Sequence, residues 1–434
     1  MSTQGNIPEV TPASMSDLED IAAFNGRIHD EGNNAERIIA TVRDLIHLNK
    51  IKKIERGFVL ARHPENNAVI TSSCLIPQNL RYGNIPIQAG NPEFVGTDTA
   101  FRQKGLISRQ FEILHQWSAE NGDDIQIIGG IPYFYRKYGY EMTVSMEPRR
   151  TDSLLVLDKL ADPEKPLQFD AAVERDIPDL IRLFGQEHQS YLLTGDWSKQ
   201  DWQYILQDSK NNGCAAKRIF MVRRKNGTLI GAIKFHNHIE DGRFYIVGAE
   251  IDPVQTTWDE VQPALLMKLK ELAQAQAELE GKLVKQVGLQ MPLSHPLSIR
   301  LAYLFKQESE GYAWYIRIPD LQKFLQKISP VIEENVHNSP YRGLSRTLKL
   351  NLYTNSLSLE FGKGKLKSIK AWKPGSYDGG DFLCPELAFL HLLMGHRSTA
   401  EIQKMYRDCY GNKDGAAVVD ACFPKRESNL SLVI

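Results

Sequence analysis

The 434-residue chain has little of what would place it in several protein classes. Its five cysteines are scattered without CxxC or other metal spacing, so we expect reduced thiols in a cytoplasm rather than a disulfide framework or a zinc site. No apolar run approaches the roughly 18 to 20 residues that span a bilayer. The net charge of −1 argues against steering toward nucleic acid or an anionic membrane. The first residues, MSTQGNIPEV, lack a basic run and an apolar core, so we expect no signal peptide.

Residues 94–140 carry the strongest functional signal, FVGTDTAFRQKGLISRQFEILHQWSAENGDDIQIIGGIPYFYRKYGY. The first four are typical of the end of a buried strand, and the loop AFRQKG that follows opens into an amphipathic helix of about 14 residues. A short strand at 125–128 then precedes two glycines and a tyrosine-rich segment. The helix has one apolar face, formed by Ile107, Phe111, Leu114 and Trp117.

The loop before this helix is suited to an anion. Gly105 ends the loop where the helix starts, so several free N–H groups and the positive end of the helix dipole point at one place. A pyrophosphate fits such a site, and Arg102 and Lys104 add positive charge beside it. An ordinary first turn with solvated basic residues has the same local pattern, so the loop alone leaves both interpretations open.

The whole stretch resembles the acyl-CoA-binding half of the GNAT N-acetyltransferases, whose signature is R/Q-x-x-G-x-G/A. Here the motif is RQKGLI, from Arg102 to Ile107, with Ile107 in place of the usual last glycine or alanine. The segment YRKYGY, from Tyr135 to Tyr140, is similar to the YGRFGY segment of the Eis (enhanced intracellular survival) branch. That branch also carries R-x-x-G-L-L, so the departure at Ile107 is shared.

The resemblance implies an α+β fold, in which tandem GNAT (acyl-CoA N-acyltransferase) domains are followed by a sterol-carrier-protein-like α+β domain. It implies acetyl-CoA as co-substrate and no metal. A backbone N–H among residues 95–97 would polarise the thioester carbonyl. The residues that the resemblance places around the cofactor are Val95, Gly96, Thr97, Arg102, Gln103, Lys104, Gly105, Leu106, Ile107, Ser108, Gly130 and Ile131.

The order of the expected elements divides the chain into three domains. Residues 1–150 form the catalytic GNAT domain, with a short strand at 7–10, a helix opened by an S-x-x-E box at Ser16 and a second helix at about 35–50. Residues 165–317 repeat this order, but the loop DPVQTTW after their central strand contains no R-x-x-G. We therefore expect a degenerate GNAT-like domain that binds no acyl-CoA. Residues 318–434 combine helices with alternating strands and resemble the sterol-carrier-protein-like C-terminal domain of the Eis branch.

Acetyl transfer from a thioester to an amine needs an acid for the leaving thiolate and a base for the amine. Tyr135 matches the tyrosine that is the acid in the Eis branch, and a phenol with a reference pKa of about 10 can protonate a thiolate of about 8.5. Four tyrosines lie between residues 133 and 140, so simple packing is the alternative role for Tyr135. For the base, the resemblance implies the main-chain carboxylate of Ile434, which is weak at its reference pKa of about 3.5 unless it is desolvated.

We interpret the sequence as a cytoplasmic acetyl-CoA-dependent N-acetyltransferase. It would move an acetyl group to a primary amine of an aminoglycoside-like molecule, a polyamine or lysine by direct transfer in a ternary complex. Asp30 and Glu31 either belong to a solvated connection or face a cationic substrate. The resemblance also implies a homo-oligomer, a hexamer in the family. The alternative, from another class, is a non-catalytic protein that binds acyl-CoA or an apolar ligand, or acts as a scaffold.

Overall fold

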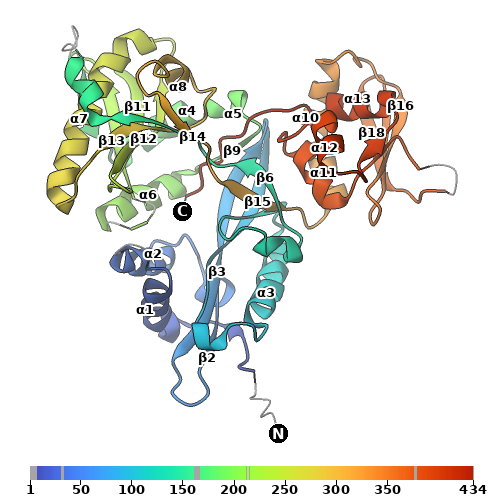
Figure 1. Ribbon diagram of the computed structural model, residues 1–434, viewed down its shortest axis with the longest axis horizontal. Coiled ribbons are helices and arrows are strands. Elements are labelled where there is room, and N and C mark those ends of the chain that lie inside the picture. Colours follow the sequence, from blue (N-terminus) through green and yellow to red (C-terminus); the bar gives the residue numbers. More distant parts are fainter. Residues whose placement is uncertain are drawn as a thin grey trace.

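The computed structural model describes residues 7–30, 34–160, 167–211, 213–214, 216–375 and 379–433. These residues form three β-sheets with helices packed on them, in three lobes (Figure 1). The first lobe lies low in the view, the second at upper left and the third at upper right. The long strand β3 rises from the foot of the first lobe to the place where the other two approach each other. The predicted mixed α and β fold with several sheets is confirmed.

The first sheet has the strand order β1-β2-β3-β4-β5-β15-β6, and β9 pairs with β3. Helices α1 and α2 share one apolar core with residues of β2 and β3. Helix α3 belongs to two other apolar clusters, which contain other residues of the sheet. The strands are β1 Thr11–Pro12, β2 Phe58–Arg62, β3 Val69–Tyr82, β4 Ile85–Thr97, β5 Ile125–Ile128, β6 Glu141–Ser145, β9 Leu193–Gly195 and β15 Ala313–Arg317. The helices are α1 Leu18–Ile28, α2 Ala35–His47 and α3 Leu106–Asn121.

Two local predictions for this lobe are wrong. The chain forms no strand at 7–10, because it pairs with β2 only at Thr11–Pro12. The capping box lies two residues earlier than predicted, where Ser14 and Asp17 cap a short 3-10 turn that leads into α1. Residues 94–97, predicted as the end of a buried strand, are the last residues of the strand at 85–97.

The second sheet has the order β14-β7-β13-β12-β11-β10-β8. Its long helix α7 packs on a core shared by the central strands. The strands are β7 Arg149–Ser153, β8 Gln168–Ala171, β10 Lys217–Arg223, β11 Leu229–His236, β12 Arg243–Ile251, β13 Gln286–Gln290 and β14 Gln307–Ser309. The helices are α4 Ile177–Phe184, α5 Glu187–Ser190, α6 Lys199–Asn211, α7 Trp258–Glu280 and α8 Pro296–Arg300.

The first two sheets exchange strands. β6 belongs to the first sheet, but β7, which follows it directly, pairs with β13 and β14 of the second. After β14 the chain returns to the first sheet, where β15 pairs with β5 on one side and with β6 on the other. Residues 313–317 were predicted to belong to the second domain, but they are part of the first sheet.

The third sheet has the order β18-β17-β16-β19-β20, and its helices pack both on it and on the first lobe. One continuous apolar core includes Ile127 and Ile316 of the first sheet together with Leu350 and Phe389 of the third lobe. The strands are β16 Arg346–Asn351, β17 Leu357–Gly362, β18 Lys365–Ala371, β19 Phe382–Leu383 and β20 Tyr410–Gly411. The helices are α9 Leu321–Lys327, α10 Ser329–His337, α11 Glu386–Leu393, α12 Thr399–Met405 and α13 Lys413–Cys422.

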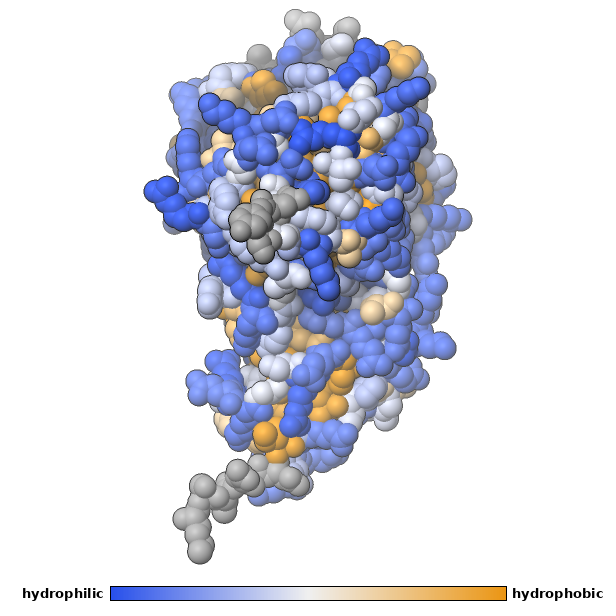
Figure 2. Space-filling model, turned by 90° about the vertical axis from the view of Figure 1, so that its right-hand side faces the viewer, coloured by the Kyte–Doolittle hydropathy of each residue, from blue (hydrophilic) through white to orange (hydrophobic). Residues whose placement is uncertain are grey.

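The surface gives no sign of a broad apolar belt on the side of the third lobe. Figure 2 shows this side as mostly hydrophilic, with hydrophobic side chains gathered low on the face, toward the N-terminal end of the chain. Among the helices that the structure describes, none combines the length and the apolarity needed to cross a bilayer.

A buried ion pair joins the first lobe to the second. Lys50 follows α2, and its Nζ lies 2.7 Å from Oδ1 of Asp201 in α6, with each side chain only 6% exposed. Asn79 of β3 donates to the other oxygen of Asp201 at 3.0 Å. Burial lowers the pKa of Lys50, while the charge of Asp201 opposes that effect. The charged form of Lys50 is therefore stable at this buried position only while Asp201 is present.

Replacing one partner of this pair should destabilise the protein strongly. In Lys50→Met the Asp201 carboxylate stays buried without its cation, and such losses cost about 3–5 kcal/mol. We expect a clear fall in the midpoint of thermal unfolding measured by scanning calorimetry. Lys50→Met/Asp201→Leu should regain part of the loss, because neither charge is then left behind.

The control is Arg43→Met, which breaks the exposed Arg43–Glu19 pair, whose side chains are 44% and 64% exposed. Exposed pairs contribute about 0–1 kcal/mol, so its midpoint should hardly move. Equal shifts for the two single variants would contradict the importance given to the buried pair.

Candidate functional site

Strands β4 and β5 separate in the middle of the first sheet. They are paired in parallel only at Ala89 with Ile125 and at Gly90 with Gln126. Beyond this point β4 remains paired with β3, with a register shift that leaves one extra residue before Gly96. Phe94 within this bulge has a φ of +52°, which a bulky residue rarely adopts. In the last part of β4, the backbone N–H and C=O groups on the side of β5 are therefore not paired with that strand.

The loop after β4 is shaped by left-handed backbone. Gln103 has a φ of +62° and Gly105 a φ of +77°, and Gly105 is the N-cap of α3. Arg109 donates to the Gly105 carbonyl at 3.2 Å as the helix begins. This bond is the first of the helix, so the N–H groups of Leu106 to Ser108 in the first turn have no acceptor within the helix. Loop and helix start together have the geometry of an anion site.

The side chains of this loop mostly brace it. Arg102 donates from Nε to the Thr97 carbonyl at 3.3 Å, so it ties the loop back to β4. Lys104 lies over the ring of Phe101, with Nζ 4.4 Å from the centroid. Ser108 Oγ lies 3.1 Å from the Tyr138 hydroxyl, which joins the first turn of α3 to the tyrosine-rich segment. The loop is thereby held in the conformation that exposes its N–H groups.

Tyr135 is buried on the α3 side of the gap. It shares an apolar cluster with Val95 and Ile107, so residues from β4, α3 and the tyrosine-rich segment meet there. Gly130, with a φ of +117°, lies so close that an added Cβ would be 3.4 Å from the Tyr135 hydroxyl. Burial, reinforced by the carboxylate of Glu93, raises the pKa of Tyr135. A raised pKa keeps the phenol protonated, as a proton donor requires.

The remaining residue that the sequence assigns to the cofactor lies at the rim. Ile131 is 60% exposed, and its carbonyl accepts a hydrogen bond from the Tyr315 hydroxyl at 3.2 Å. The predicted cofactor residues from 95 to 131 thus belong to the end of β4, the loop and first turn of α3, and the segment after β5.

Two residues of this site are absent from the sequence predictions. Tyr315 of β15 packs against Tyr135, with ring centroids 5.4 Å apart. No local signal shows this contact, because it results from the return of the chain to the first sheet. Glu93 is half-buried on β4, and burial raises its pKa to about 7. The sequence could have indicated Glu93, because it is the one acidic residue in the apolar segment that ends β4.

The proposed base lies outside the described residues, but the residue before it is placed. Val433 is buried, and its N–H donates to Oε1 of Gln78 on β3 at 3.3 Å. Gln78 lies opposite Ala89, one of the last residues at which β4 is paired with β5. The end of the chain therefore meets the sheet where the two strands separate. Ile434 itself is not described.

The acidic loop before α2 is explained only in part. Asp30 accepts hydrogen bonds through Oδ1 from the N–H groups of Asn34 at 2.7 Å and Ala35 at 3.2 Å. It thus supports the start of α2. Glu31 lies outside the described residues. In the part of the chain that is described, no three His, Cys, Asp or Glu side chains are grouped so as to hold a metal ion.

Comparison by sequence found no matching family model and no matching curated protein. Comparison by structure found solved proteins of similar architecture. A probable N-acyltransferase from Enterococcus faecalis V583 is 14% identical, with 98% of each chain covered and a TM-score of 0.68. A GCN5-related N-acetyltransferase from Anabaena variabilis is also 14% identical, covering 97% of this chain and 98% of its own, with a TM-score of 0.65.

Eis1 from Mycobacterium abscessus is 12% identical, with 98% of this chain and 99% of Eis1 covered and a TM-score of 0.57. At these identities the comparisons establish the fold. The chain has the fold of the GCN5-related N-acetyltransferases over nearly its whole length.

Proposed function

We propose that the protein is an acetyl-CoA-dependent N-acetyltransferase that transfers the acetyl group directly to a primary amine in a ternary complex. One observation carries the proposal. The end of β4 beyond its pairing with β5, the anion-binding geometry at Gly105 and the buried Tyr135 lie together, since Val95, Ile107 and Tyr135 share one apolar cluster. A thioester with a pyrophosphate tail needs these three features in this order. The fold shared with N-acetyltransferases supports the same conclusion.

In this proposal the pyrophosphate binds the N–H groups at the start of α3. The acetyl group enters the gap, where a backbone N–H of residues 95–97 stabilises the oxygen as it becomes negative. The amine nitrogen forms a bond to the carbonyl carbon and the carbon–sulfur bond breaks. The amine proton passes to a carboxylate, and Tyr135 gives its proton to the leaving thiolate.

We also propose the predicted three-part organisation, with tandem GNAT domains and a sterol-carrier-like third domain, and the hexamer of the Eis branch. The second domain would bind no acyl-CoA. Its helix α7, which follows the strand corresponding to β4, carries Asp259 and Glu260 in its first turn. These acids would repel a pyrophosphate, whereas the first turn of α3 contains no acidic residue.

Gly105 gives a first test through acetyl-CoA affinity. Gly105→Ala forces a residue with a Cβ into φ +77°, at a cost of roughly 1–2 kcal/mol, and shifts the N–H groups of the loop. We expect acetyl-CoA affinity, measured by titration calorimetry, to fall about tenfold or more. The matched control is Gly122→Ala at the other end of α3, where φ is +78° and an added Cβ is equally unobstructed. An equal loss of affinity in both variants would show that general strain, not the loop, is responsible.

Tyr135→Phe tests the acid. Removing the hydroxyl should lower kcat about 100-fold or more, in the range for loss of a positioned acid, while acetyl-CoA affinity stays unchanged. Tyr133→Phe is the control, because Tyr133 lies in the same segment but is 75% exposed. If kcat and affinity fell together in Tyr135→Phe, Tyr135 would have a packing role instead.

Two carboxylates are candidates for the base, and pH separates them. We propose the Ile434 carboxylate, because Val433 brings the chain end to the strand separation. Glu93 is the second candidate, because it is half-buried beside Tyr135 and its pKa is raised to about 7. A base must be unprotonated, so Glu93 would make kcat fall as the pH drops below about 7. The Ile434 carboxylate, with a reference pKa of about 3.5, would leave kcat level there.

The measurement is kcat against pH for the wild type, for Glu93→Gln and for a chain extended by three glycines after Ile434. With the Ile434 carboxylate as base, the extension should abolish turnover and Glu93→Gln should retain it. The reverse pattern would transfer the role to Glu93.

The alternative function is a non-catalytic protein that binds acyl-CoA or an apolar ligand. Release of free thiol from acetyl-CoA, measured against polyamines, aminoglycosides and lysine peptides, distinguishes the two. Release that depends on one amine class supports the enzyme. Tight acetyl-CoA binding without release for any amine would favour the alternative.

A further inference from the structure

Two of the five cysteines lie beside each other in the third sheet, in the lobe at the upper right of Figure 1. β19 and β20 are antiparallel, and Leu383 is paired with Tyr410. The residue that follows Leu383 is Cys384, and the residue that precedes Tyr410 is Cys409. Continuing the register by one residue therefore places the two cysteines directly opposite each other.

The backbone at this position favours a close approach of the two side chains. The N–H of Cys384 donates to the Asn351 carbonyl of β16 at 3.0 Å, on the edge of β19 that faces away from β20. The N–H of Cys409 donates to the Tyr406 carbonyl at 3.1 Å. Neither N–H is bonded to the opposite cysteine, which is the pattern of a non-hydrogen-bonded pair. The Cα atoms of such a pair are about 4.5 Å apart, and a disulfide needs about 4.4–6.8 Å.

The two thiols also interact with each other inside the core. Hydrogen bonding to Cys409 and burial together raise the pKa of Cys384. Cys384 is 0% exposed and Cys409 3% exposed, and both belong to the apolar core that the third lobe shares with the first. Cys422 belongs to the same core, and there burial raises the thiol pKa to about 12. The thiol–thiol interaction thus distinguishes Cys384 and Cys409 from Cys422.

We propose that Cys384 and Cys409 form a site of reversible oxidation, at which hydrogen peroxide converts the opposed thiols into a disulfide between β19 and β20. The inference goes beyond the proposed acetyl transfer and does not depend on it. A small oxidant is required, because the access of a reagent to the sulfur limits thiol oxidation and both thiols are buried.

The oxidation has two steps. The thiolate of Cys409 attacks one oxygen of the peroxide, the oxygen–oxygen bond breaks and hydroxide leaves, so that the sulfur becomes a sulfenic acid. The Cys384 sulfur then attacks this sulfur, and the sulfur–oxygen bond breaks. The two thiol protons combine with the hydroxide ions released in the two steps to form two molecules of water. The thiols are thereby oxidised by two electrons and the peroxide is reduced by two, and a dithiol such as dithiothreitol reverses the change.

The disulfide would close a segment of chain that contacts the first lobe. Residues 384–409 include α11 and α12, and α11 packs on β6 of the first sheet. At the end of α11, the Leu393 carbonyl accepts a hydrogen bond at 2.5 Å from the hydroxyl of Tyr82 on β3. A crosslink between the two ends of this segment restricts the unfolded chain more than the folded one. Oxidation should therefore stabilise the third lobe.

The experiment treats the folded protein with hydrogen peroxide and identifies the product by mass spectrometry. We expect each chain to lose two of its five thiols and about 2 Da, the mass of two hydrogen atoms. A tryptic digest should contain one pair of peptides joined through Cys384 and Cys409, and dithiothreitol should separate them. Circular dichroism during the treatment shows that the chain stays folded.

Cys384→Ala and Cys409→Ala should each prevent the joined pair of peptides from forming. Cys422→Ala is the matched control, because it removes a buried thiol from the same core and should leave the joined pair unchanged. If an alanine variant does not fold, the peptide map of the wild type decides the matter by itself.

The second readout is the midpoint of thermal unfolding, measured by scanning calorimetry without reductant. We expect the oxidised wild type to unfold about 3 °C or more above the reduced protein. Joined peptides that contain other cysteines, sulfinic acids on separate thiols or a midpoint that does not rise would each overturn the inference. None of these results bears on acetyl transfer, so the two proposals fail independently.

Discussion

The separation of β4 from β5 is the constraint on which the rest of the site depends. A strand paired on both sides has no backbone groups left for a ligand. β4 avoids this state because it pairs with β5 at only two positions and then continues along β3 through a bulge. β15 pairs with the other edge of β5 and so holds it in place. Tyr135 and the start of α3 pack against Val95 near the end of β4, the strand that also carries Glu93.

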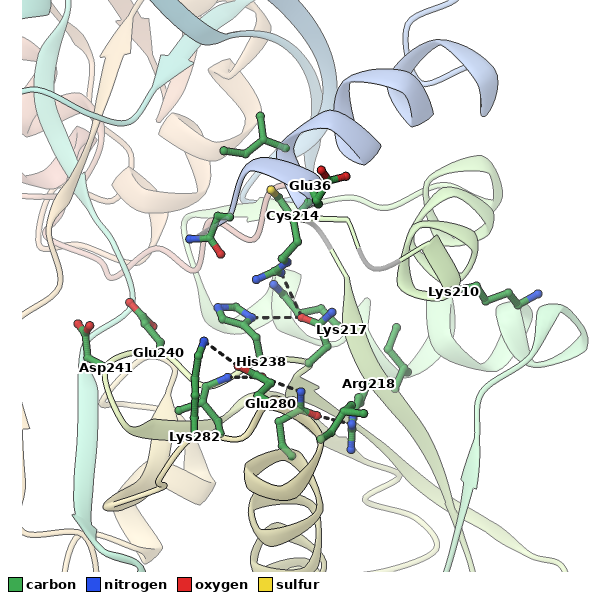
Figure 3. Close-up of a pocket in the computed structure, with 18 of the residues that line it drawn as sticks. Glu36, Lys210, Cys214, Lys217, Arg218, His238, Glu240, Asp241, Glu280 and Lys282 are labelled. Carbon is green, nitrogen blue, oxygen red and sulfur yellow. Dashed lines mark hydrogen bonds and ion pairs between the residues drawn. The ribbon is translucent and has the colours of Figure 1, made fainter. Parts of the chain in front are cut away.

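The surroundings of Tyr135 are not the product of one continuous stretch of chain. Tyr315, which packs on Tyr135, comes from a strand that the chain inserts after completing most of the second sheet. A cleft between the first two lobes (Figure 3), lined by His29 and Arg37 on one side and by Lys217 and Glu280 on the other, has one wall from each lobe, and the buried Lys50–Asp201 pair links the same two lobes. The surroundings of Tyr135 and the cleft therefore both depend on how the lobes are held together.

The sequence predicted the local elements well where one pattern dominated. The helix after Gly105, the second helix expected at about 35–50 and the strand Ile125–Ile128 lie close to their expected positions. The predictions failed where a competing local choice existed. Ser14 and Asp17 satisfy the same capping chemistry as the predicted box, two residues earlier in the chain.

What the sequence by itself determined is the loop at Gly105, its helix and the tyrosine-rich segment, because glycine conformation and apolar periodicity act over a few residues. Only the tertiary structure decided the exchange of β7 and β15, the position of Tyr315 and the raised pKa of Glu93. It also decided the surroundings of Lys217, whose pKa is lowered by burial and by the charge of Arg37, 180 residues away in the chain. These properties depend on burial and on charges brought together from distant segments, which no local pattern records.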